Sequence, residues 1–125
     1  ARYGEGVRAA LKAAPDPQER LRAIVDESLA GGNFDLAAMS AWLNFYALAL
    51  TEPEAGRLLS IYHRRLRSNL IHALRPRAGD QAPRLAETLG ALIDGVYLRA
   101  VLDQSGPEPA KAHRMVRRWL EDALG

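Results

Sequence analysis

The chain contains no cysteine, which excludes disulfide bonds and metal sites built on thiolates. It also lacks any run of about 18 uninterrupted apolar residues, so we expect no membrane-spanning helix. Neither sign of charge dominates, because 17 Lys and Arg face 15 Asp and Glu for a formal net charge of +2. That balance is too mild to indicate nucleic-acid binding by this chain on electrostatics alone. Its start has no signal-peptide layout, and we expect a cytoplasmic protein.

Arrangements typical of catalysis are missing as well. His63, His72 and His113 do not share a helical face at metal-ligand spacing, and no carboxylate completes a set. There is no Ser/His/Asp arrangement and no glycine-rich phosphate loop, since Gly31–Gly32 reads as the end of a helix. We therefore expect no metal, no cofactor and no enzymatic activity.

Alternating apolar and polar residues, the pattern of a half-buried strand, are also absent. Apolar spacings of three and four recur instead from end to end, which predicts an all-α fold of about six helices. The expected helices span about residues 2–14, 17–29, 35–50, 53–75, 81–102 and 107–123. The segment "RPRAGDQAP" is expected to break the fourth helix after Arg75. Because the first helix is already under way at Ala1, residues 1–14 are expected to end a helix that begins in a preceding domain.

The helix expected over residues 81–102 is apolar nearly all round, whereas a surface helix has one apolar stripe and one polar face. It must therefore be covered on two sides, either as the central helix of a monomer or by a second copy of the chain. We favour the homodimer, in which the last two helices form a four-helix interface with those of the partner. The residues expected at this interface are Leu85, Leu89, Leu92, Ile93, Val96, Ala100, Val116 and Leu120.

Aromatic residues are scarce, yet four of the eight lie between Phe34 and Tyr46. Trp42, Phe45 and Tyr46 share one arc of the third helix. Such a stripe is either the wall of a ligand pocket between helices or part of the hydrophobic core, and the core is the commoner case.

Three motifs in register resemble a known family. "AWLNFYALAL" (Ala41–Leu50), "RRLRSNL" (Arg64–Leu70) and "LGALIDGVYLRAVL" (Leu89–Leu102) occur in the order and spacing of tetracycline-repressor (TetR) family regulators, downstream of their DNA reader. More narrowly, the chain resembles the C-terminal domain of the betaine-inhibitor (BetI) type. The resemblance implies an all-helical TetR-like bundle, with residues 15–125 as an effector-binding and dimerisation domain. It also implies that operator DNA is bound only through an N-terminal helix-turn-helix, which this sequence does not contain.

In regulators of this type the third helix and the next enclose the effector, which the resemblance implies is choline or a related quaternary amine. A quaternary ammonium has no N–H to donate, so proteins hold it with aromatic faces. The ligand-binding residues expected here are Trp42, Phe45, Tyr46, Tyr62, Asp94 and Tyr97. Asp94, isolated in an apolar run, either balances the ligand's charge or bonds a backbone amide or an arginine across the dimer. Two alternatives stay open: a bulkier apolar or aromatic effector, and a helical protein-interaction module without a ligand.

Overall fold

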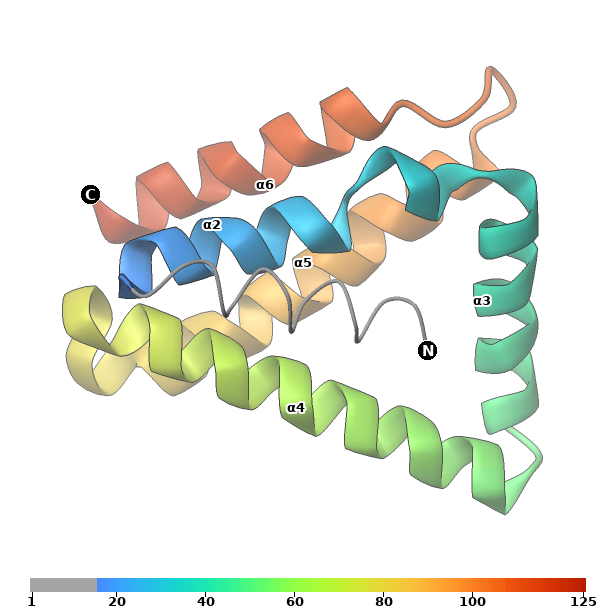
Figure 1. Cartoon of the computed structure of the whole chain (residues 1–125), viewed down its shortest axis with the longest axis horizontal. Helices are drawn as coiled ribbons and strands as arrows, with labels where there is room; N and C mark the ends of the chain where they lie inside the picture. Colours follow the sequence, from blue (N-terminus) through green and yellow to red (C-terminus); the bar gives the residue numbers. More distant parts are fainter. Residues whose placement is uncertain (1–15) are drawn as a thin grey trace.

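The computed structural model describes residues 16–125, and within them the chain is helical with no strand (Figure 1). Its elements are α2 (Pro17–Ser28), η1 (Gly31–Phe34), α3 (Leu36–Ala49), α4 (Pro53–Ala78), η2 (Gly79–Gln81), α5 (Ala82–Leu102) and α6 (Pro109–Leu124). The all-α prediction is confirmed, with five α-helices in this part of the chain. The helix expected over residues 2–14 lies outside the described residues.

Proline and aspartate set the helix starts close to their predicted positions. α2, α4, α5 and α6 each carry a proline in the first turn, where its missing N–H costs no hydrogen bond. α3 starts instead at Asp35, whose carboxylate accepts a hydrogen bond of 2.8 Å from the Ala38 N–H.

The end predicted for the fourth helix is wrong, because α4 continues through Pro76 to Ala78. Proline inside a helix removes the hydrogen bond to the carbonyl four residues earlier, here that of His72. His72 and Pro76 both lie on the exposed side of α4, where water can serve that carbonyl. The helix ends at Gly79 instead, whose φ of 55° suits a residue without Cβ, and η2 then leads into α5.

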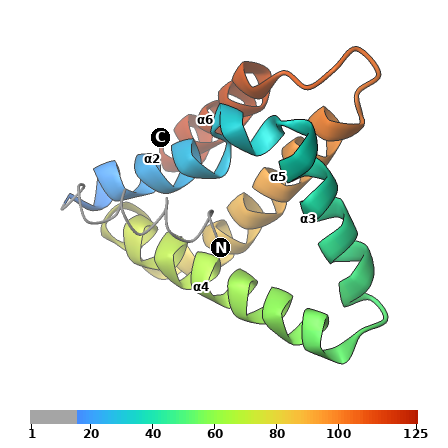
Figure 2. The ribbon, with the colours of Figure 1, turned by 45° about the vertical axis from the view of Figure 1, so that its right-hand side comes forward.

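One core holds α2, α4, α5 and α6 together. α4 packs along α5, α2 lies against α4, and α6 covers the other side of α5 (Figures 1 and 2). The most deeply buried large side chains come from all four helices: Ile24, Val25, Leu70, Leu74, Leu89 and Val116. Among the described helices, none is long and apolar enough to cross a membrane.

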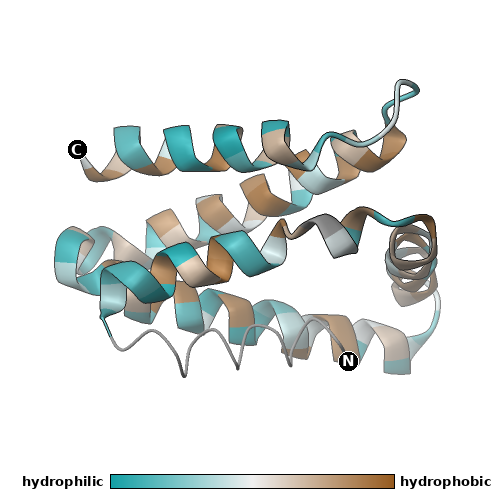
Figure 3. Ribbon diagram, turned by 45° about the horizontal axis from the view of Figure 1, so that its top comes forward, coloured by the Kyte–Doolittle hydropathy of each residue, from teal (hydrophilic) through white to brown (hydrophobic). Residues whose placement is uncertain are grey.

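α3 is the exception to this packing. It runs from η1 to the start of α4 and closes the open side between them (Figure 2), and its main contacts are with those two elements. Its ribbon, seen nearly end-on in Figure 3, is mostly in the hydrophobic colours, yet Met39 is its only buried residue. Leu36 is 76% exposed and Leu48 is 50% exposed. Tertiary burial therefore stabilises α3 less than the other α-helices.

Candidate functional site

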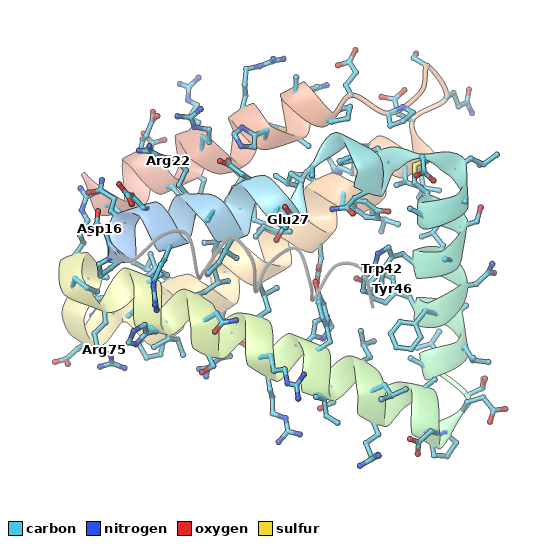
Figure 4. The ribbon with its side chains drawn as sticks, in the orientation of Figure 1. Asp16, Arg22, Glu27, Trp42, Tyr46 and Arg75 are labelled. Carbon is cyan, nitrogen blue, oxygen red and sulfur yellow. The ribbon has the colours of Figure 1, made fainter. Side chains whose placement is uncertain are left out.

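An aromatic cluster lies where α3 faces the rest of the bundle. Trp42 is at its centre, with ring centroids 5.7 Å from Tyr46, 5.4 Å from Tyr62 on α4, and 6.0 Å from Phe45. Trp42 and Tyr46 lie one turn apart on α3, and both side chains point away from the outer side of α3 into the space toward α4 and α5 (Figure 4). The predicted arc of aromatic residues on this helix therefore faces the inside of the molecule.

The cluster borders a small cavity of about 30 Å³. Its lining comes from five elements and consists of Ser28, Asn33, Trp42, Tyr46, Tyr62, Ile93, Asp94 and Tyr97. Five of the six residues expected to bind a ligand are thus brought together. The sixth, Phe45, does not line the cavity and instead packs beside Trp42 and Tyr46. The sequence does not identify Ser28 and Asn33 as lining residues, because only the tertiary fold brings the end of α2 against α5.

Most of the polar groups in this wall serve the fold. The Asn33 side-chain amide donates to the carbonyls of Glu27 (2.9 Å) and Ser28 (3.2 Å), which satisfies the end of α2. The Tyr97 hydroxyl donates to the Asn33 carbonyl over 2.7 Å and so joins α5 to η1. Burial raises the pKa of Tyr97, and the negative charge of Asp35 raises it further. Tyr97 therefore stays a neutral donor at physiological pH.

Among the described residues that line this cavity, Asp94 is the acidic one. Partial burial raises the pKa of its carboxyl group, and His63 on α4 lowers it. The His63 Nε2 atom lies 3.6 Å from Asp94 Oδ2, and the two side chains remain 44% and 40% exposed. The partner of Asp94 found among the described residues is thus a histidine of its own chain.

A larger hollow of about 230 Å³ lies between α2 and α6, near the C-terminal end of α4. Its lining carries the guanidinium groups of Arg22, Arg77 and Arg117 and the carboxylates of Asp26 and Glu121, and none of its described residues is aromatic. Asp26 is hydrogen-bonded to His113. Three guanidinium groups without an aromatic face among these described residues suit a cationic amine poorly, so the aromatic cavity is the better candidate despite its size.

Burial separates the eight residues expected at a dimer interface into two groups. Leu85, Leu89, Ile93, Val96 and Val116 are at most 8% exposed and belong to the core of this chain. Because α4 and α6 cover α5 from two sides, these five side chains do not form a surface that a second copy can contact. Leu92, Ala100 and Leu120 keep part of their surface exposed. The open face of α5 instead carries Ala91, Gly95, Leu98 and Leu102, and Met115 on α6 is also exposed.

Residues 17–125 match the family described as "BetI-type transcriptional repressor, C-terminal". The chain is 39% identical to the HTH-type transcriptional regulator BetI of Brucella canis over 118 residues, which cover 94% of this chain and 60% of that protein. It is 46% identical to the BetI regulator of Rhizobium meliloti over 95 residues, which cover 75% of this chain and 47% of that protein.

A crystal structure of a putative transcriptional regulator from Pseudomonas aeruginosa PAO1 has a similar fold, with a TM-score of 0.83 and 25% identity. The match covers 98% of this chain and 62% of that one. The chain thus spans about 60% of the length of the first curated relatives that it matches. The family match, which covers nearly the whole chain, shows that it belongs to the BetI-type transcriptional repressors of the TetR family and corresponds to their C-terminal domain.

Proposed function

We propose that this domain senses a small cationic effector, of the choline class, for a transcriptional repressor. The observation that carries the proposal is the wall of the aromatic cavity, where Trp42, Tyr46 and Tyr62 line the same space as the carboxylate of Asp94. A quaternary ammonium is held by aromatic faces and balanced by a negative charge. A carboxylate in the wall also favours a cation over the bulkier apolar effector, because an apolar ligand would bury that carboxylate further without offering it a positive charge.

The energy available from this wall is sufficient for a metabolite sensor. Each aromatic face contributes about 0.5–2 kcal/mol to cation binding, depending on how well water is excluded. Three faces therefore supply up to about 6 kcal/mol, which corresponds to a Kd of tens of micromolar.

The cavity must open to admit such a ligand. Its volume of about 30 Å³ is roughly a tenth of the smallest ordinary ligand pocket. The element best suited to move is α3, since it supplies Trp42 and Tyr46 and buries only Met39. Displacement of α3 by the effector is then the event that the rest of the regulator would detect.

The proposal includes a homodimer and an operator-binding domain elsewhere in the full regulator. In this chain the surface available for the dimer is the open face of α5 with the adjacent side of α6. Small residues at Ala91 and Gly95 permit close approach of two helices, and Leu98, Leu102 and Met115 are 43–64% exposed. The full protein would act in the cytoplasm, where its operator is.

Thermal shift and titration calorimetry with choline, betaine aldehyde and 3,3-dimethylbutan-1-ol test the ligand class. The last compound has the shape of choline but no charge. We expect stabilisation by the cations, about 2.7 kcal/mol at 100 times Kd, and little by the neutral isostere. Binding of the isostere as strong as that of choline would favour the apolar effector. Melting unaffected by every compound would favour the ligand-free interaction module.

A further inference from the structure

A second hollow lies directly outside the aromatic cavity, against the first half of α4. It is open to solvent, has a volume of about 410 Å³, and is lined by Tyr46, Ala49, Leu50, Gly56, Leu59, Ser60, His63, Arg64 and Arg67. Tyr46 belongs to the lining of both spaces, so the outer hollow and the inner cavity adjoin at this residue. The two spaces differ more than tenfold in volume, and only the outer one has room for a small ligand.

The same boundary is crossed by an ion pair. Asp94 lines the inner cavity, whereas His63 lines the outer hollow, and their side chains meet at 3.6 Å. The His63 ring also contacts the ring of Tyr62, a wall of the inner cavity, at a centroid distance of 5.4 Å. His63 therefore covers the outer side of the carboxylate on which a cationic ligand depends.

We propose that Tyr46 and His63 form the gate between the outer hollow and the inner cavity, and that His63 competes with a cationic effector for Asp94. This inference rests on the proposed function and assigns it an access route and a specificity-determining residue. An effector arriving in the hollow displaces the imidazole from Asp94 and moves the Tyr46 ring, which joins the two spaces into one pocket.

The competition is for the carboxylate of Asp94, which the His63 side chain meets at 3.6 Å. The charged groups beside His63 in the hollow are Arg64 and Arg67, and no acidic residue joins the described lining there. A side chain with a fixed positive charge at position 63 would therefore hold Asp94 against the ligand, whereas an uncharged side chain without a donor would leave the carboxylate to it.

The size of this effect follows from the exposure of the pair. Exposed ion pairs are worth about 0.2–1 kcal/mol, so competition weakens cation binding by about 1.5- to 5-fold. Because burial raises the pKa of Asp94, the parent and all variants are compared at the same pH.

The test is a choline titration at one fixed pH near neutral, followed by the fluorescence of Trp42 in a Trp119→Phe background. We expect His63→Ala to bind choline about 1.5- to 5-fold more tightly than the parent, because the competitor for Asp94 is gone. His63→Lys places a positive charge beside Asp94 and is expected to bind choline more weakly than the parent. His72→Ala, also on the exposed side of α4 but outside the hollow, is the matched control and should behave as the parent.

The outcomes separate this inference from the proposed function. Choline binding that is the same in the parent, His63→Ala and His63→Lys overturns the gate while leaving the cation site in place. Absence of choline binding by the parent and all three variants overturns the proposed function itself. Slower association in His63→Ala, measured by stopped flow, would also contradict a gate that His63 helps to close.

Discussion

Replacement of Tyr97 by phenylalanine tests how the wall of the aromatic cavity is held. The change removes the hydroxyl that donates to the Asn33 carbonyl over 2.7 Å and keeps the ring, whose centroid lies 5.1 Å from that of Phe34. A hydrogen bond of this kind contributes about 1 kcal/mol net, and a part-buried carbonyl left unpaired adds to the cost. We therefore expect a loss of about 1–2 kcal/mol in the free energy of unfolding.

For a chain of 125 residues, that loss corresponds to a fall in Tm of about 4–8 °C. Urea denaturation followed by far-UV circular dichroism measures it directly, at one fixed protein concentration. The exposed hydroxyl of Thr51, 3.5 Å from the Leu48 carbonyl, supplies the control, and Thr51→Val should change stability by less than about 0.5 kcal/mol.

The dependence on pH gives a second, independent readout. The folded-state pKa of Tyr97 is raised above its ordinary value of 10.0, so its contribution is fully present below about pH 10 and is lost as pH rises through the folded pKa. The stability difference between the parent and Tyr97→Phe should therefore be constant around neutral pH and shrink above about pH 10. A difference below about 0.3 kcal/mol at neutral pH would refute the view that this hydroxyl holds α5 to η1.

Further predictions concern the charge of the cavity, the core, the open face of α5 and the α2–α6 contact. Asp94→Asn should abolish the preference for choline over its neutral isostere. Because burial raises the pKa of Asp94, the parent loses stability as pH rises above about 4, so in urea melts the stability of Asp94→Asn relative to the parent should be highest at neutral pH. Leu89→Ala, at a fully buried position, should lower the free energy of unfolding by about 2–5 kcal/mol at any protein concentration. Leu98→Arg, on the open face of α5, should instead lower the mass measured by sedimentation from that of a dimer, with little loss of subunit stability. His113→Gln should lower the free energy of unfolding by less than about 1 kcal/mol, because its partner Asp26 is half exposed. A double-mutant cycle with Asp26→Asn should give a coupling energy of that size, and additive effects of the two changes would contradict a direct interaction between the side chains.

The helices could be predicted well because their signals are local. Proline in the first turn marks four starts, and the period of the apolar residues marks the buried faces. The break predicted at Pro76 failed because the cost of a proline depends on whether water can reach the freed carbonyl. That exposure is a property of the folded chain, and in the exposed last turn of α4 the cost is small.

Part of the candidate site could also be predicted. Trp42 and Tyr46 share a face by helix geometry alone, and an acidic residue in an apolar run such as Asp94 demands a partner wherever it lies. His63 could not be chosen as that partner, because 31 positions separate the two in sequence and only the packing of α4 on α5 brings them together. Asn33 and Ser28 could not be predicted as lining residues for the same reason.

By itself the sequence determined that the chain is helical, where most helices begin, and which side of α3 carries the aromatic rings, since these follow from contacts within one or two turns. The tertiary structure alone decided how the apolar surface of α5 is shared. α4 and α6 cover most of it inside one chain, which leaves a narrower outer face than the pattern of residues suggested. Tertiary packing also decided that the aromatic cavity is small, because the separation of α3 from α4 and α5 depends on contacts between residues far apart in the chain.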